Sequence, residues 1–251
     1  MIPSIRVGKH PVGVAVSPDG LRVYVVNAPE DTVSVIDAGA NVAVAPPIVV
    51  GRHPFGLAIS PDARRVYVAN RDAGTVSVID ASTKIRIVDI PVGDYPHNVA
   101  VSPDGRRAYI ANANSDTVSV IDTGEDAVVG DAVPVGDFPF GVAVSPDGRR
   151  VYVTNRHADT VSVIDTGDNT VALIAVGGQP MLAAVSPDGR RVYVTNFKDN
   201  TVSVIETSSN KVTATIAVGN TPYGVAVSPD GRHVYVANAN SDTVSVIDAD
   251  G

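Results

Sequence analysis

Hydrophobic and polar residues alternate with a period of two in short segments along this chain. Between Gly178 and Gly219, the stretches "RRVYVTN" and "TVSVIE" alternate and are rich in β-branched residues, while "MLAAVS" and "KVTATIAVG" are apolar stretches of similar length. The turn sequences "SPDG" and "TSSN" separate two of these pairs. Alternation bounded by Pro, Gly, Asp and Asn predicts strands joined by tight turns. The segment therefore predicts a four-stranded antiparallel meander.

The same pattern recurs six times along the chain. The serines of the turns, 41 to 43 residues apart, are Ser17, Ser60, Ser102, Ser145, Ser186 and Ser228. A period of this length is typical of repeat folds whose units cannot bury both sheet faces alone. A radial arrangement buries each face against the next unit. We therefore predict an all-β fold, a six-bladed β-propeller of four-stranded antiparallel blades, as a single domain over residues 1–251.

The two ends of the sequence suggest how the last blade is completed. Residues 4–8, "SIRVG", match "TIAVG" at residues 215–219, the fourth strand of an earlier repeat. The last repeat has only three strand-like stretches, ending at Asp248. We therefore expect the last blade to be shared between residues 1–8 and 217–251.

One tetrapeptide in the second strand of each repeat carries a family resemblance. "YVTN" stands at Tyr152 and Tyr193, with "YVAN" at Tyr67 and Tyr235, "YIAN" at Tyr109 and "YVVN" at Tyr24. With the preceding "GVAVSPDGR", the whole chain resembles the YVTN family of β-propeller repeats. The resemblance implies a surface-layer or exported protein outside the cytoplasm. It also implies kinship with binding proteins and relatives of lactonases, which usually have seven blades.

Composition and charge exclude several classes of protein. Lys and Arg total 19 against 27 Asp and Glu, so the net charge of −8 opposes binding to nucleic acid. There is no cysteine, which excludes disulfides, thiolate metal sites and cysteine nucleophiles. No apolar run reaches the roughly 18 residues of a membrane span. The first residues do not resemble a signal peptide, so an exported protein would have lost its signal.

Most of the charged residues have structural explanations. The aspartates of the SPDG turns are Asp19, Asp62, Asp104, Asp147, Asp188 and Asp230, and a short carboxylate there is expected to accept bonds from turn amides. The acids that end the third strands are expected to do the same. The arginines that follow the SPDG turns are expected to pair with these acids in a solvated rim rather than to bind an anion.

Divergent residues concentrate in the segments before the first strands and in the loops after the second strands. Because strands run up and down, these segments share one end of each sheet, which we call the top end; the SPDG turns lie at the bottom end. The candidate ligand-binding residues at the top end are Phe55, Arg71, Tyr95, His97, Phe138, Phe140, Arg156, His157, Phe197 and Tyr223. Loops on a rigid scaffold are where binding residues concentrate. The alternative is that the aromatic residues only pack on neighbouring loops.

Two functions remain open at the level of sequence. The first is a non-enzymatic scaffold, a monomer, that presents the top end to a protein, glycan or small ligand. The second is a lactonase-like hydrolase or lyase that uses Arg71, Asp72, His97 and Arg156. No G-x-S-x-G, HExxH or phosphate-loop motif is present, so we expect no enzyme. We also expect no cofactor and no metal, although four histidines map near the top end: His10, His53, His97 and His157.

Overall fold

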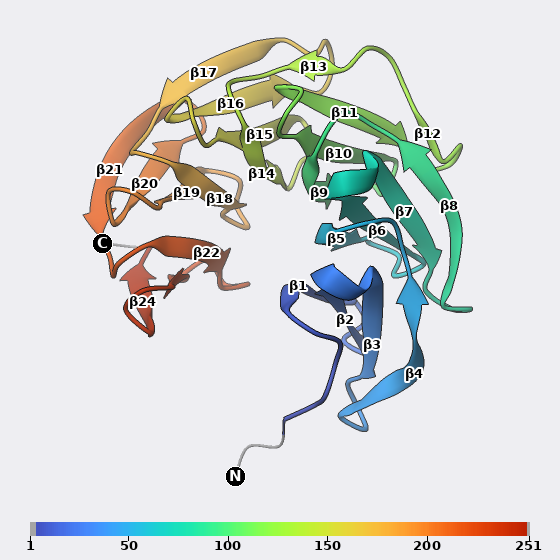
Figure 1. Cartoon of the computed structure of the whole chain (residues 1–251). Coiled ribbons are helices and arrows are strands. Elements are labelled where there is room, and N and C mark those ends of the chain that lie inside the picture. The colour runs from blue at the N-terminus through green and yellow to red at the C-terminus, as the bar shows by residue number, and fades with distance from the viewer. Residues whose placement is uncertain (1–3, 250–251) are drawn as a thin grey trace. The chain divides into compact units, whose positions relative to one another are not determined.

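The computed structural model describes residues 4–249 and divides into two compact units, which meet in the sequence between Ala132 and Val133. Each unit is a series of antiparallel sheets whose strands follow one another in chain order. Within each unit the first strand of a sheet lies innermost and the last lies outermost (Figure 1). The all-β architecture and the repeated four-stranded meander are thus confirmed, because alternating segments with turn residues between them form the strands as expected.

The first unit contains three sheets. The first has strands β1 (Pro11–Val16), β2 (Arg22–Asn27), β3 (Thr32–Asp37) and β4 (Val42–Val49). The second has β5 (Pro54–Ile59), β6 (Arg65–Asn70), β7 (Thr75–Asp80) and β8 (Ile85–Pro91). The third has β9 (Pro96–Val101), β10 (Arg107–Asn112), β11 (Thr117–Asp122) and the short β12 (Ala127–Val128). Two single-turn 3-10 helices, η1 (Ala28–Glu30) and η2 (Arg71–Ala73), follow β2 and β6.

The second unit begins with the short strand β13 (Val133–Pro134) and also contains three sheets. The first has β14 (Pro139–Val144), β15 (Arg150–Asn155), β16 (Thr160–Asp165) and β17 (Val171–Ala175). The second has β18 (Pro180–Val185), β19 (Arg191–Asn196), β20 (Thr201–Glu206) and β21 (Lys211–Ala217). The third has β22 (Pro222–Val227), β23 (His233–Asn238) and β24 (Thr243–Asp248). No helix in residues 4–249 is long and apolar enough to cross a membrane.

Apolar side chains between neighbouring sheets form the core of each unit. In the first unit, Tyr24 and Val33 of one sheet pack with Val66 and Ile79 of the next, and all four are fully buried. In the second unit, Tyr152 packs in the same way on Val192. Each tyrosine is the first residue of the YVTN-type tetrapeptide. The tetrapeptide is therefore a packing element between sheets, as its alternation with valine predicts.

The SPDG turns are held by a serine that bonds the aspartate two residues later. The serine Oγ donates to Oδ1 of the aspartate at 2.5 Å in Ser17–Asp19 and at 2.6 Å in Ser145–Asp147. The same carboxylate oxygen accepts the backbone N–H of the residue two positions further on, at 3.0 Å from Arg149 in the second case. The predicted structural role of these aspartates is confirmed. Hydrogen bonds to the ionised form lower its pKa.

These turns predict a loss of stability in acid. In all six turn aspartates the serine bond is the main cause of a pKa below the ordinary 3.8, and bonds from Ser82 and Thr83 lower the pKa of Asp80 to about 2. A carboxyl with a lowered pKa in the folded state stabilises the fold above its unfolded pKa and loses that contribution as the pH falls through the folded value. We expect the melting temperature to fall between about pH 4 and about pH 2. Asp147→Asn should melt lower than wild type at neutral pH and fall less steeply in acid; an equal slope would contradict the assignment.

The asparagine that ends each second strand bonds differently from what the sequence predicts. Its position at the start of a loop predicts backbone partners for its side-chain amide. Instead, Nδ2 of Asn70 donates to Oγ1 of Thr75 at 3.0 Å and to Oγ of Ser77 at 2.9 Å, both on the adjacent strand β7. Asn155 repeats this pattern with the hydroxyls of Thr160 and Ser162. The reason is burial, because these asparagines lie inside the sheet stack, where neighbouring hydroxyls are the nearest acceptors.

Among the residues that the structure describes, the last sheet has three strands, β22–β24. Residues 4–10 carry no strand, and residues 1–3 lie outside the described part. The sharing of the last blade between residues 1–8 and 217–251 therefore stays a prediction. Gly8 lies at the repeat position expected from the match of "SIRVG" at residues 4–8 with "TIAVG" at residues 215–219. A Cβ there would meet Asn27, as one at Gly51 would meet Asn70.

Candidate functional site

A constant backbone frame supports the variable residues at the top end. The first strand of every repeat begins with a proline, and the residue before this proline has a left-handed backbone with φ between 48° and 55°. These six residues are His10, His53, Tyr95, Phe138, Gln179 and Thr221. None of them is glycine, so each conformation must be held by its surroundings. The carbonyl of His53 accepts the N–H of Arg71 at 3.0 Å, and the carbonyl of Phe138 accepts that of Arg156 at 3.0 Å. The segment before each first strand is thereby tied to the loop after the second strand.

A side chain from the preceding sheet completes this frame. Oδ1 of Asp31 accepts the backbone N–H of His53, Oδ1 of Asp159 accepts that of Gln179, and Oδ1 of Asn200 accepts that of Thr221, each at 2.8 Å. Sequence analysis missed these acceptors. The available signal was an Asp, Asn or Gly before the first Thr of every third strand, a position that is left-handed in all six repeats. The frame fixes three variable side chains per repeat: the residues before and after the proline, and the residue after the asparagine.

The first unit brings four predicted residues together at the top end. The guanidinium carbon of Arg71 lies 3.3 Å from the ring centroid of Phe55 and 5.2 Å from that of Tyr95. The rings of Phe55 and His97 meet edge to face with centroids 4.4 Å apart. Tyr95 lies 6.4 Å from His97 by the same measure. A guanidinium over aromatic faces is held by cation–π attraction, which is stronger where water is excluded.

The contact between Arg71 and His97 indicates which ring nitrogen of a neutral imidazole carries the proton. Nη2 of Arg71 contacts Nε2 of His97, and an arginine can only donate hydrogen bonds. Nε2 is therefore the acceptor, and the ring proton of a neutral His97 lies on Nδ1. His97 is only 2% exposed, whereas Arg71 and Tyr95 are partly exposed. In this arrangement the arginine, not the histidine, is the group at the surface.

Asp72 does not join this cluster, although the lactonase-like interpretation placed it beside His97. Its Oδ2 lies 3.2 Å from Nδ1 of His53, and its backbone carbonyl accepts Nη2 of Arg52 at 3.0 Å. Asp72 is the middle residue of η2, directly after Arg71, and successive side chains of a 3-10 helix leave its axis about 120° apart, so the two residues meet different partners. His53, Asp72 and Arg52 line a cavity of about 530 Å³ together with His10 and Asp31. Among residues 4–249 no group of three or more acidic or histidine side chains could hold a metal ion.

The second unit has its own aromatic group at the top end. The rings of Phe138 and His157 stack with centroids 4.4 Å apart, and Nδ1 of His157 lies 3.7 Å from Asp137 Oδ1. Phe140 and Tyr223 meet edge to face at 5.9 Å. The guanidinium carbon of Arg156 lies 5.8 Å from the ring of Phe140.

The remaining candidate in this unit, Phe197, lies directly after β19. Its backbone N–H donates to the carbonyl of Gln179 at 3.1 Å, and its ring is half-buried. Phe140 is buried to 3% exposure, so it packs inside the unit rather than at the surface. Each unit therefore combines an arginine, a histidine and aromatic rings at its top end.

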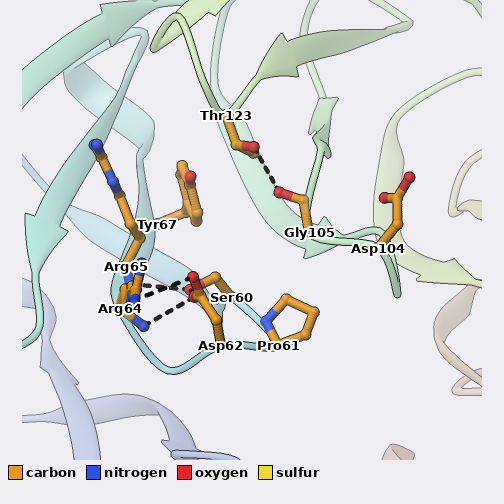
Figure 2. A pocket seen from close by; sticks show the side chains of 9 residues that line it. All are labelled: Ser60, Pro61, Asp62, Arg64, Arg65, Tyr67, Asp104, Gly105 and Thr123. Atoms are coloured by element: carbon orange, nitrogen blue, oxygen red, sulfur yellow. Dashed lines mark hydrogen bonds and ion pairs between the residues drawn. The ribbon is translucent and has the colours of Figure 1, made fainter.

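The bottom end holds pockets between neighbouring sheets that the sequence did not predict. Figure 2 shows one of about 360 Å³ between the second and third sheets, lined by Asp62, Arg65, Tyr67 and Thr123 among others. On the side of this pocket formed by the third sheet, Oγ1 of Thr123 donates to the carbonyl of Gly105 at 2.5 Å. Burial raises the pKa of Tyr67 to about 12, so its hydroxyl stays protonated at neutral pH.

Two β-propeller families match parts of the sequence. The family described as "Lactonase, 7-bladed beta-propeller" matches residues 40–128 and 82–184, which together span more than half of the 251 residues. The family described as "YNCE-like beta-propeller" matches residues 171–251. The two lactonase matches begin 42 residues apart (82 minus 40), which is one repeat. The family therefore matches the chain twice, and the second match is shifted along the sequence by one repeat.

Solved structures with the same fold come from several bacteria. Hydrazine synthase of Kuenenia stuttgartiensis superposes with a TM-score of 0.59 at 22% identity, covering 99% of both chains. A functionally unknown protein from Desulfotomaculum acetoxidans DSM 771 gives 0.79 at 19%, covering 89% of this chain and 78% of that one. A protein from Bacteroides uniformis ATCC 8492, titled "putative 6-phosphogluconolactonase", gives 0.83 at 18%, covering 98% and 82%. These identities support the fold alone. Among curated proteins, none matches this sequence.

Proposed function

Since the chain belongs to the lactonase-type seven-bladed β-propeller family, we propose that it is a β-propeller that binds a small anionic ligand at Arg71. Its six repeats would form six blades of one propeller domain, against the seven in the family's description. The YVTN-type repeat and a location outside the cytoplasm belong to the same proposal. In the first unit the proposed binding surface consists of Phe55, Arg71, Tyr95 and His97. The six candidates of the second unit, which are Phe138, Phe140, Arg156, His157, Phe197 and Tyr223, are considered within that unit by itself.

One observation carries the proposal: the Arg71 guanidinium is stacked on Phe55 and fixed by Nε2 of His97. Both contacts orient the guanidinium before any ligand arrives. A planar, preorganised guanidinium suits a carboxylate or phosphate, which it can bind through two parallel hydrogen bonds. Phe55 and Tyr95 supply apolar surface for the remainder of the ligand. A single charged group enclosed by aromatic rings favours a small ligand over a protein or a glycan.

Lactone hydrolysis is the second candidate, favoured by the family and by a structural neighbour titled as a lactonase. In this reaction water adds to the lactone carbonyl, the ring C–O bond breaks, and a hydroxy acid forms with release of a proton. His97 is the residue in the cluster that could take the proton from the water. Its Nε2 is engaged by Arg71, so Arg71 would have to move before His97 could act as a base. The arrangement therefore supports binding before it supports catalysis.

The test measures binding and turnover with a matched pair of compounds. We expect gluconate to bind in calorimetry and Arg71→Ala to weaken it about tenfold or more, as loss of a charge-assisted bond implies. Arg52→Ala, which removes a neighbouring guanidinium outside the cluster, should leave the affinity unchanged. Absence of binding to gluconate, or an equal loss in both variants, would contradict the proposal. Proton release from glucono-δ-lactone that disappears in His97→Gln would establish the hydrolase instead.

A further inference from the structure

A second pocket at the bottom end of the first unit differs from its counterparts in the pairing of its inner arginine. It has a volume of about 410 Å³, lies between the first and second sheets, and is lined by Arg22, Tyr24, Arg64, Asp80 and Ser82 among others. It corresponds, one repeat earlier, to the pocket in Figure 2. Arg22 and Tyr24 occupy the positions of Arg65 and Tyr67 in that pocket. The repeat therefore supplies an internal comparison.

In the corresponding pockets the inner arginine is bonded to the following sheet. Nη1 of Arg65 pairs with Oδ2 of Asp126 at 2.6 Å. Nη1 of Arg150 lies 3.4 Å from Oδ1 of Asn210 and also donates to the carbonyl of Thr207. Asp126 and Asn210 occupy the same position of the repeat, the left-handed residue of the turn after the third strand. An acceptor at this position satisfies the arginine of the preceding sheet.

In the pocket of Arg22 that acceptor is replaced by a cation. The residue 42 positions before Asp126 is Lys84, and its backbone is left-handed in the same way, with φ of 59° against 50° for Asp126. No hydrogen bond or ion pair is formed by the Arg22 guanidinium with any residue in the described range 4–249. The change from Asp to Lys at this repeat position therefore removes the acceptor that pairs with the equivalent arginine, Arg65, in the neighbouring pocket.

The pocket also contains a buried tyrosine hydroxyl, as do the corresponding pockets with Tyr67 and Tyr152. Tyr24 is fully buried, lines the pocket, and its Oη has no hydrogen-bond partner among residues 4–249. A buried polar atom without a partner is costly, and a bound ligand or water is the usual remedy. Burial raises the pKa of Tyr24, so the hydroxyl is a donor at neutral pH. The pocket thus offers an O–H donor beside a guanidinium.

The two acids that line the pocket are already satisfied by other donors. Oδ1 of Asp19 accepts Oγ of Ser17 at 2.5 Å and the N–H of Leu21 at 2.9 Å. Oδ1 of Asp80 accepts the N–H and the hydroxyl of Ser82, and both groups of Thr83 as well. These carboxylates reduce the positive potential of the pocket but do not occupy the Arg22 guanidinium.

We propose that this pocket binds a small tetrahedral oxyanion of the phosphate or sulfate class through Arg22 and Tyr24 Oη. The guanidinium supplies several N–H donors in a fork, and the tyrosine hydroxyl donates from the buried side. Arg64 is largely exposed, with Nε 3.8 Å from Asp62, and it lies at the rim. The site is independent of the top-end cluster around Arg71.

The test uses inorganic phosphate and the neighbouring pocket as its control. Calorimetry is carried out on the full chain at constant ionic strength, with chloride replaced by phosphate, so that general screening does not contribute. All titrations are made in the Arg71→Ala background, which removes the top-end guanidinium proposed above to bind anions. We expect one phosphate per chain, with affinity at least tenfold lower in Arg22→Gln and several-fold lower in Tyr24→Phe. Arg65→Gln, in the pocket whose arginine is already paired, should bind phosphate as wild type does. Absence of binding to wild type, or equal losses in Arg22→Gln and Arg65→Gln, would overturn the proposal.

Two reciprocal substitutions test the role of the repeat position directly. Lys84→Asp recreates the acceptor that Asp126 provides and should abolish phosphate binding while leaving the fold intact by circular dichroism. Asp126→Lys should free Arg65 and create a second site, so that the stoichiometry rises from one to two phosphates per chain. A folded Lys84→Asp variant that still binds phosphate with wild-type affinity would show that the position does not determine binding and would overturn the proposal.

Discussion

Replacement of Tyr152 by alanine is expected to lower the free energy of unfolding by about 3–5 kcal/mol, the usual cost of deleting a large buried aromatic side chain. Tyr152 is fully buried and packs between two sheets of the second unit with Val161, Val192 and Ile205. The deletion leaves a cavity that neighbouring strands cannot fill without breaking their ladder. For a chain of this length the melting temperature should fall on the order of 10 °C.

The same repeat offers a matched control for this substitution. Tyr235 occupies the equivalent position of the last sheet but is 43% exposed. Tyr235→Ala removes the same atoms with less buried surface, so its cost should be less than half that of Tyr152→Ala. Urea unfolding of both variants gives the two free energies. Equal losses would show that burial of the tyrosine is not what makes Tyr152 important.

The second large effect is expected from Gly56→Ala in β5. A Cβ at this position would lie 2.7 Å from the Cα of Asn98 and 2.7 Å from the carbonyl oxygen of His97, both in the backbone of β9. Backbone cannot rotate away as a side chain can, so the two strands must separate. Overpacking of this kind costs typically 1–3 kcal/mol, occasionally more. Phe55 and His97 lie on these two strands, so the cluster around Arg71 should be disrupted at the same time.

Gly224→Ala is the control for Gly56→Ala. Gly224 occupies the same position in β22, where the nearest atom to an added Cβ is the Cβ of Ala237 at 3.8 Å, an ordinary contact. We expect this variant to be as stable as wild type or slightly more stable, because alanine restricts the unfolded chain. Thermal melts and gluconate titrations of both variants make the comparison. A Gly56→Ala protein with wild-type stability would refute the close approach of β5 and β9.

The repeat architecture was predictable because its signals are local. Alternation of valine with polar residues specifies a strand within six residues, and Ser-Pro-Asp-Gly specifies a turn within four. The bond from Ser145 to Asp147 spans only two residues, and the burial of Tyr152 follows from its place in an alternating strand. All-β sheets in chain order therefore follow from the sequence alone.

The partners of individual site residues were less predictable. The ten candidates at the top end were chosen because they vary between repeats, and that criterion does not reveal which of them meet. Asp72 was grouped with His97 but lies beside His53, because it is the next residue after Arg71 in η2 and successive side chains of a 3-10 helix point in different directions. The role of Asp31 as an acceptor for the His53 N–H was not foreseen, since the two are 22 residues apart and belong to different sheets.

The strands and their order, the SPDG turns and the tyrosines between sheets all follow from the sequence alone. Each of these features depends on neighbours within a few residues. The tertiary structure decided which side chains form sites. Arg71 meets His97 across 26 residues and Arg65 meets Asp126 across 61, and both contacts exist only because successive sheets pack side by side. Lys84 acquires its significance in the same way, because its repeat position is that of Asp126, whose partner Arg65 belongs to the preceding sheet.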